Sequence, residues 1–188
     1  YINFKDMIYS IIWKINIKVL YLYMKKKVLK NIIDYGCNTG HLTKYLHSQL
    51  LDVNFHAYEP NLIHFNKINF ESSNIFLYND YNKLPKQKKS TLILVSNVLE
   101  YVNDVNEYLH EIKRILGLNS YVCVVYNWKH SPLALSPFIR SFFSKRSIKS
   151  IDQNEPNNHL KKQEIIDLHE NLGCQLIKIN FDLTFTNQ

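Results

Sequence analysis

Short apolar runs alternate with stretches of helical periodicity along most of this chain. The runs lie at residues 32–33, 53–57, 75–78, 91–95 and 121–126, with amphipathic helical patterns between several of them. The run at 91–95 shows no polar alternation, which is typical of a central parallel strand that is buried on both faces. Strands that alternate with helices predict the α/β class, here a doubly wound, mostly parallel sheet with helices on both faces.

Two of the helical patterns have a clear apolar face. In the helix after residue 40 this face is expected to carry Leu42, Tyr45, Leu46 and Gln49. The helix that follows the fourth strand has Asp104 as a candidate N-cap and Gly117 as a candidate terminator. Its apolar stripe predicts a core-facing side, and we expect its charged residues to turn outward: Glu111, Lys113 and Arg114.

The two irregular parts of the chain suggest its domain organisation. Residues 1–30 form an N-terminal segment in which 8–23 has the spacing of an amphipathic helix, too short and too polar to span a bilayer. It would either cover the core or the active site, or touch a membrane surface. Residues 31–188 form the main domain, in which about 128–158 do not follow the regular α/β repeat and form an insertion. A helix at 161–172 and a strand at 175–183 follow it.

A glycine-bearing turn joins the first strand to its helix, in the order Asp34, Gly36, Cys37, Asn38 and Gly40. The glycines allow a sharp bend and a close approach of the backbone to a ligand. About 20 residues later the second strand ends at Glu59, where a carboxylate can accept hydrogen bonds from both hydroxyls of a ribose. The third glycine of a pyrophosphate-binding turn is missing, so the pattern favours a nucleoside ligand without a pyrophosphate.

The segment Asp34-Tyr35-Gly36-Cys37-Asn38-Thr39-Gly40 resembles the first motif of the class I S-adenosylmethionine-dependent methyltransferases. Four further segments resemble later elements of that family in the right order: 58–60, 79–85, 91–102 and 109–126. The resemblance covers roughly residues 30–182 and implies a Rossmann-like fold with S-adenosylmethionine as cofactor. It also implies that the insertion at about 128–158 is a lid over the substrate pocket, with an ordinary surface excursion as the alternative. The closing seventh strand of the family has no candidate after Gln188.

The resemblance also implies roles for individual residues. Asp80 would accept a hydrogen bond from the adenine amine, and the backbone N–H of Tyr81 would meet a ring nitrogen. Ser96 and Asn97 would lie beside the methionine part of the cofactor. Tyr101 stands where many relatives carry a histidine, and a phenol with a pKa near 10 is a poor base at neutral pH. His130 and His159 are alternatives, and we assign no catalytic residue.

The composition indicates which kinds of partner the protein is expected to bind. The formal net charge of +7 would suit a partner such as nucleic acid or a membrane surface. The chain is, however, rich in Lys, Asn, Ile, Tyr and Phe together, and this general compositional bias is the better explanation of the charge. The basic runs lack the interleaved aromatic pattern of an RNA-binding strand, which disfavours nucleic acid. Three cysteines without paired spacing predict free thiols in the cytoplasm and no metal site.

The sequence therefore predicts an S-adenosylmethionine-dependent methyltransferase that modifies an oxygen atom of a small-molecule, glycan or lipid-linked acceptor. The acceptor class rests on an association of the segments 127–128 and 157–160 with methyltransferases of glycan and lipid-linked sugar biosynthesis. Two alternatives stay open: a non-catalytic or RNA-associated cofactor-binding module, and a Rossmann oxidoreductase. The sequence makes no prediction of the oligomeric state.

Overall fold

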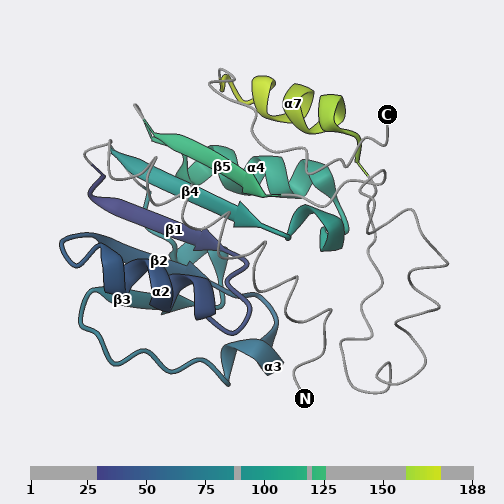
Figure 1. The fold of residues 1–188 in the computed structure, drawn as a ribbon. Coiled ribbons are helices and arrows are strands. Elements are labelled where there is room, and N and C mark those ends of the chain that lie inside the picture. The colour runs from purple at the N-terminus through teal and green to yellow at the C-terminus, as the bar shows by residue number, and fades with distance from the viewer. Residues whose placement is uncertain (1–28, 87–89, 118–119, 126–159, 175–188) are drawn as a thin grey trace, which may run out of the picture.

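The computed structural model describes residues 29–86, 90–117, 120–125 and 160–174. Its centre is a five-stranded sheet in which all the pairings are parallel (Figure 1). In sequence order the strands are β1 Asn31–Tyr35, β2 Asn54–Tyr58, β3 Ile75–Tyr78, β4 Thr91–Ser96 and β5 Tyr121–Val125. In space the order is β3-β2-β1-β4-β5. The strand order thus reverses between β1 and β4, which is where ligands bind in sheets of this kind.

Helices cover both faces of the sheet (Figure 1). The longer ones are α2 His41–Gln49, α4 Val105–Ile115 and α7 Lys162–Glu170, and the short ones are α3 Leu62–Phe65, η1 Tyr81–Lys83 and η2 Leu99–Tyr101. Adjacent side chains of a strand point to opposite faces, so Ile32 packs in one cluster and Ile33 in the other. Together these observations confirm the predicted α/β, Rossmann-like architecture.

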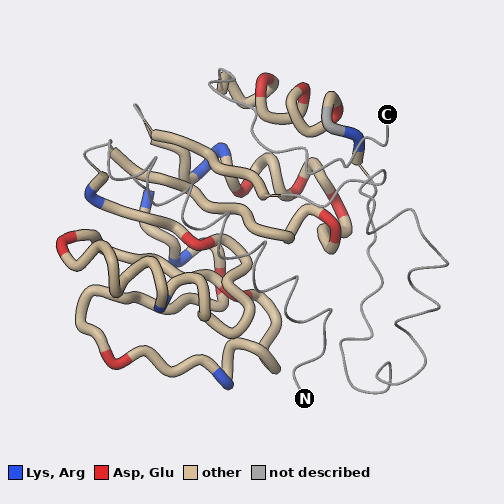
Figure 2. Tube along the Cα trace, viewed as in Figure 1, with Lys and Arg blue, Asp and Glu red and all other residues tan. Residues whose placement is uncertain are grey.

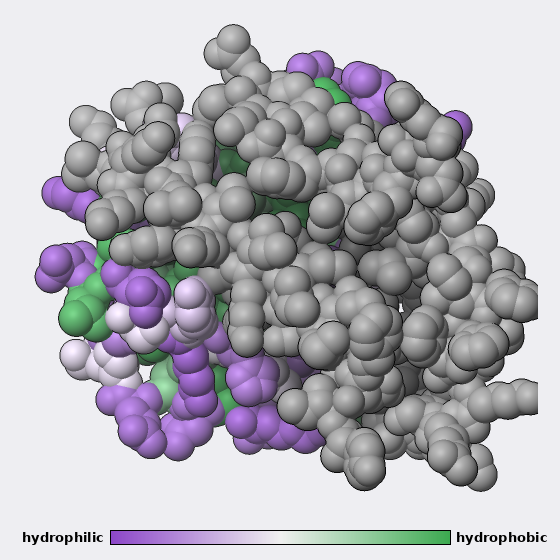
Figure 3. Space-filling view, viewed as in Figure 1, coloured by the Kyte–Doolittle hydropathy of each residue, from purple (hydrophilic) through white to green (hydrophobic). Residues whose placement is uncertain are grey.

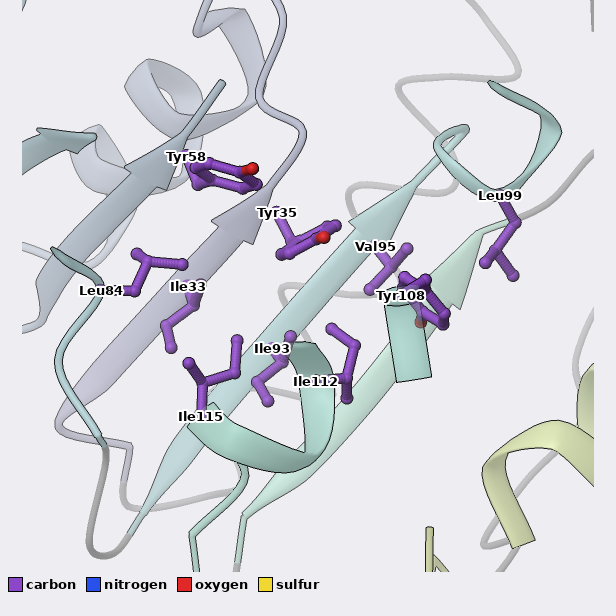
Figure 4. Close-up of a cluster of buried hydrophobic side chains, with 10 residues drawn as sticks. All are labelled: Ile33, Tyr35, Tyr58, Leu84, Ile93, Val95, Leu99, Tyr108, Ile112 and Ile115. Carbon is purple, nitrogen blue, oxygen red and sulfur yellow. The ribbon is translucent and has the colours of Figure 1, made fainter. Parts of the chain in front are cut away.

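The two apolar clusters contain side chains from different helices. Leu46 of α2 packs with the smaller cluster, which also contains Ile32, Val53, Phe55, Leu92 and Leu94. The larger cluster lies beneath α4 (Figure 4), and its buried members are Ile33, Tyr35, Tyr58, Leu84, Ile93, Val95, Leu99, Tyr108, Ile112 and Ile115. Every residue from Thr91 to Val95 is buried, as expected for a central strand.

The predicted helix faces need correction at several charged and polar positions. In α2 the buried residues are Thr43 and Leu46, whereas Tyr45 and Gln49 are exposed. In α4 Lys113 is exposed as expected, but Glu111 is buried and Arg114 is half-buried. Both of these side chains have partners on other elements, described below, and those contacts explain their burial.

Three predictions lie outside the described residues: the N-terminal helix at 8–23, the insertion at about 128–158 and the strand at 175–183. Within the described part, no helix combines the length and the apolar character needed to cross a membrane. The same residues contain no group of three or more side chains that could hold a metal ion. On the viewed face, the surface around α2 and α3 is largely hydrophilic, with apolar side chains scattered over it (Figure 3).

Candidate functional site

The predicted site residues follow four neighbouring strands at the edge where those strands end. Asp80 follows β3, Glu59 follows β2, the glycine turn follows β1, and Ser96 ends β4. Because the strands are parallel, these segments share the carboxyl edge of the sheet. Acidic positions occur along this edge and at the start of α4 (Figure 2).

Backbone hydrogen bonds fix the glycine turn against β2. The N–H groups of Gly36 and Cys37 both donate to the carbonyl oxygen of Tyr58, at 2.8 and 2.9 Å. Gly36, Asn38 and Gly40 have positive φ angles of 77°, 51° and 74°. The predicted sharp bend is therefore present, and it uses the left-handed conformation that glycine tolerates best.

Gly36 is also required by packing within the protein. A Cβ atom at this position would lie 2.5 Å from Cγ2 of Val98, in the loop after β4. A Cβ at Gly40 would likewise lie 2.7 Å from Cζ of Phe70. From the sequence, the close approach of a ligand was the expected reason for these glycines. The structure adds a second reason, the close approach of the side chains of Val98 and Phe70 to the backbone of the turn.

Glu59 is 5% exposed, and backbone donors orient its carboxylate. Oε2 accepts from the N–H of Asn38 at 2.7 Å, and Oε1 accepts from the N–H of Asn61 at 2.9 Å. A carboxylate oxygen has two acceptor sites, so each oxygen can accept one more hydrogen bond. Two oriented acceptors side by side fit the two hydroxyls of a ribose.

Asp34 is buried beneath the turn and is held by a residue of α2. Its Oδ2 accepts a hydrogen bond from Oγ1 of Thr43 at 2.5 Å. Burial raises the pKa of Asp34 to about 6; the Thr43 hydrogen bond opposes this shift, and the negative charge of Glu59 adds to it. The Asp34 carboxyl group thus links the end of β1 to α2, which follows the turn, and is electrostatically coupled to Glu59.

The thiol of Cys37 is an unreactive neighbour of these carboxylates. Burial raises its pKa far above the usual value, and the charges of Asp34 and Glu59 raise it further. The thiol is therefore protonated at neutral pH and is not a nucleophile. In this structure Cys37 contributes to the turn through its backbone, by the bond to Tyr58 described above.

Asp80 and Tyr81 form the start of a short loop between β3 and β4. Oδ1 of Asp80 accepts from the N–H of Asn82 at 2.9 Å, so Asp80 caps η1. The ring of Tyr81 lies under the guanidinium of Arg114, with 5.1 Å between Cζ of Arg114 and the ring centroid. The predicted adenine-facing segment is therefore a structured turn.

The remaining candidates lie beyond β4. Ser96 is half-buried at the end of the strand, and Asn97 is exposed with φ 53°. The N–H of Asn97 donates to the carbonyl of Val125 at 2.8 Å, which ties this turn to β5. Tyr101 in η2 is 48% exposed. His130 and His159 lie outside the described residues.

Three residues that support the site were missed from the sequence: Thr43, Glu111 and Arg114. Thr43 holds Asp34, while Glu111 accepts a hydrogen bond from the phenol of Tyr35, which directly precedes Gly36. Arg114 holds the loop that begins at Asp80. A polar residue at a buried helix position was the available signal for Thr43. Helical periodicity gave no such signal for the two charged residues.

Comparison with known proteins identifies the family. Residues 14–178 match a family model described as a methyltransferase domain. The chain belongs to this family. The match confirms the predicted methyltransferase class, with S-adenosylmethionine as the cofactor, in preference to an oxidoreductase. No protein of curated function gives a significant match to this methyltransferase domain.

Solved structures share the fold at low sequence identity. A type 11 methyltransferase from Sulfolobus solfataricus is 21% identical with a TM-score of 0.52, and the match covers 76% of this chain and 72% of that one. A chain of the complex between the Haloferax volcanii Trm112 methyltransferase activator and a methyltransferase is 12% identical with a TM-score of 0.58. This match covers 80% of the present chain and 65% of that one. The plantazolicin methyltransferase BpumL, solved with a monoazolic desmethylPZN analogue and S-adenosylhomocysteine, is 18% identical with a TM-score of 0.52, and the match covers 81% of this chain and 52% of that one. This methyltransferase domain thus spans about half to three quarters of the length of these structures.

Proposed function

We propose that this domain transfers the methyl group of S-adenosylmethionine to an oxygen atom of a small-molecule, glycan or lipid-linked acceptor. The observation that carries the cofactor site is the carboxylate of Glu59. Backbone donors orient its two oxygens, and it lies beside a glycine turn at the switch point of the sheet. This arrangement supports a ribose clamp, since one carboxylate can accept from both hydroxyls of a ribose.

The other predicted residues divide the rest of the cofactor between them. Asp80 and the backbone of Tyr81 would receive the adenine, at the strand end adjacent to Glu59. The turn from Gly36 to Gly40, supported by Asp34, would run along the ribose and the methionine part. Ser96 and Asn97 would contact the methionine part from the next strand end. The order of these strands along the sheet supports the assignment.

Methyl transfer requires little covalent chemistry from the protein. The cofactor supplies a methyl group that is already activated by a positively charged sulfur. The residues around it have to position the acceptor in line with the methyl group and exclude water. A hydroxyl acceptor also has to lose a proton, and no described residue is assigned as its base. The negative charge of Glu59 favours binding of a cationic cofactor at this edge.

Calorimetric titration of S-adenosylmethionine and S-adenosylhomocysteine tests the cofactor site. We expect micromolar binding to the wild type and a loss of at least about tenfold in Glu59→Ala, because the variant removes both acceptors of the ribose. Glu71→Ala is the matched control, since Glu71 is an exposed carboxylate of the loop before β3. Equal binding by the wild type and Glu59→Ala would contradict the ribose clamp. A folded wild type that binds neither compound would contradict the enzyme proposal as a whole.

Transfer of labelled methyl groups tests the acceptor class. The protein is incubated with S-[methyl-³H]adenosylmethionine and with separate lipid, glycan, small-molecule and RNA fractions. We expect label in one of the first three fractions, in an O-methyl linkage. Salt-sensitive labelling of RNA would instead support the RNA-associated alternative. Binding without any transfer would support a non-catalytic module.

We also propose that the domain works in the cytoplasm. Cys37, Cys123 and Cys174 are free thiols in the structure, which agrees with the reducing conditions of the cytoplasm. A lipid-linked acceptor would bring the N-terminal segment at 8–23 to a membrane surface. Vesicle flotation of the wild type and of a variant with lysines in this segment would test that contact.

A further inference from the structure

Arg114 joins α4 to the loop that follows β3. Its Nη2 donates to the carbonyl oxygen of Tyr81, and its Nη1 donates to the carbonyl oxygen of Leu84 at 3.4 Å. Its guanidinium also lies over the ring of Tyr81. One half-buried side chain therefore contacts both ends of a four-residue segment that lies 30 to 33 residues earlier in the sequence.

The other hydrogen bonds of this loop are local. Lys83 N–H donates to the carbonyl of Asp80 and Leu84 N–H to that of Tyr81, each at 3.1 Å. A single 3₁₀ turn has poor hydrogen-bond geometry and is seldom stable by itself. Leu84 is buried in the core beneath α4, which fixes one end of the segment. At the other end, the ring of Tyr81 packs against the edge of the same core, and Arg114 adds a hydrogen bond to the Tyr81 carbonyl oxygen and a stacking contact with the ring.

The position of Arg114 is itself defined with respect to the glycine turn. Glu111 lies one turn earlier on the same face of α4 and accepts a hydrogen bond from Tyr35 at the end of β1. Two positions one turn apart on α4 thus contact Tyr35, which precedes Gly36, and Tyr81, which follows Asp80. Helix α4 therefore contacts both the residue before the glycine turn and the loop that begins at Asp80.

We propose that Arg114 is a positioning residue for the adenine end of the cofactor site. It holds Asp80 and the backbone of Tyr81 in the arrangement that distinguishes adenine from hypoxanthine. This inference rests on the proposed function, because it assumes that the loop receives adenine. The planar guanidinium suits the role, since it donates in two fixed directions and stacks on an aromatic ring.

The test measures base selectivity in addition to affinity. Calorimetry gives the dissociation constants of S-adenosylhomocysteine and S-inosylhomocysteine, which differ at the 6-position of the base. We expect the wild type to prefer the adenine compound. In Arg114→Gln its affinity falls about tenfold and the preference shrinks, because the loop is no longer fixed. Arg114→Lys retains the charge and the alkyl stem, and its preference is intermediate.

Lys113→Gln is the matched control, because it removes one positive charge from an exposed neighbouring position. It should bind both compounds as the wild type does. Circular dichroism and thermal melting establish that each variant is folded, and Arg114→Lys serves as the informative variant if Arg114→Gln does not fold. A merely structural role of Arg114 would weaken the binding of both compounds equally.

The outcomes separate the two proposals. A wild type that binds S-adenosylhomocysteine with a preference for adenine, together with an unchanged preference in both Arg114 variants, overturns the role of Arg114 alone. A wild type that binds neither compound overturns the proposed function and this inference with it. A reduced preference in the Arg114 variants, with Lys113→Gln unchanged, establishes the role.

Discussion

The phenol of Tyr35 donates a hydrogen bond to the carboxylate of Glu111, 76 residues further along the chain. Tyr35 is 6% exposed and directly precedes the glycine turn, and Glu111 lies on α4. Burial raises the pKa of Glu111 above its usual value, although the hydrogen bond from Tyr35 opposes this shift. The pair therefore joins the carboxyl end of β1 to α4 through groups that have little access to water.

Tyr35→Phe should destabilise the domain by about 1–3 kcal/mol, because the buried carboxylate of Glu111 loses a donor. Urea unfolding measures the change. In Glu111→Gln the amide oxygen can still accept from Tyr35, so this variant should lose less. The double variant Tyr35→Phe/Glu111→Ala, compared with its two single variants, gives the coupling energy, because each of these substitutions removes the hydrogen bond. Additive effects of Tyr35→Phe and Glu111→Ala would show that the hydrogen bond contributes nothing measurable.

The buried carboxyl of Asp34 should make stability depend on pH. Its pKa is raised to about 6 in the folded protein, so the native state binds more protons than the unfolded state between pH 4 and 6. Stability from this group is complete below pH 4 and is lost as the pH rises through 6. Relative to Asp34→Asn, the wild type should lose up to about 3 kcal/mol between pH 4 and 7. Parallel stability profiles for the two proteins would exclude this coupling.

Thr43→Val tests the hydrogen bond that supports Asp34. The variant keeps the shape of the side chain but removes the hydroxyl donor, and we expect a loss of about 1–3 kcal/mol at neutral pH. It should also raise the pKa of Asp34 further, because that hydrogen bond favours the charged form. Thr43→Ser retains the donor and is the control. Equal stability of the valine and serine variants would assign Thr43 to packing alone.

Gly36→Ala should cost more than Gly173→Ala. Both glycines have similar positive φ angles, 77° and 80°, so alanine is strained at either position. A Cβ at Gly36 also meets Val98, whereas a Cβ at Gly173 has no atom within 4 Å. Gly173→Ala should therefore lose about 1 kcal/mol and Gly36→Ala clearly more. Thermal unfolding of Gly36→Ala/Val98→Ala, compared with the single variants, measures the part due to the contact.

His169 should make the attachment of α7 sensitive to acid. Its Nδ1 donates to the carbonyl of Ile165 at 2.7 Å, which leaves Nε2 to accept from the hydroxyl of Tyr108 at 3.0 Å. Burial lowers the pKa of His169, so the unfolded state binds its proton first as the pH falls below about 6.5. The wild type should lose stability relative to His169→Gln between pH 7 and 5. Hydrogen exchange of the α7 amides locates the effect.

The sequence was sufficient for the sheet and for the positions of the candidate site. Runs such as 91–95 are apolar because they are buried on both faces, so their burial is encoded locally. Glu59 was found from its spacing to the glycine turn, a distance along the chain that the strand-helix-strand unit largely determines. The third strand was predicted with the bounds that the structure shows, Ile75–Tyr78.

The supporting contacts could not be predicted in the same way. Periodicity places Glu111 and Arg114 toward solvent because charged side chains usually avoid burial. Their partners, Tyr35 and Tyr81, lie far away in sequence, and no local pattern encodes those pairings.

The central place of β1 has a consequence for how the domain acquires its structure during synthesis. β1 pairs with β2 after one short crossover, but its other edge pairs with β4, so that Tyr35 lies opposite Val95. The loop that this second pairing closes is long, and its closure carries a larger entropic cost and slows the search. While β4 is still being synthesised, a β1–β2–β3 unit would therefore expose the edge of β1 in addition to that of β3, and the β1 edge has to be kept from pairing with other chains until β4 is available.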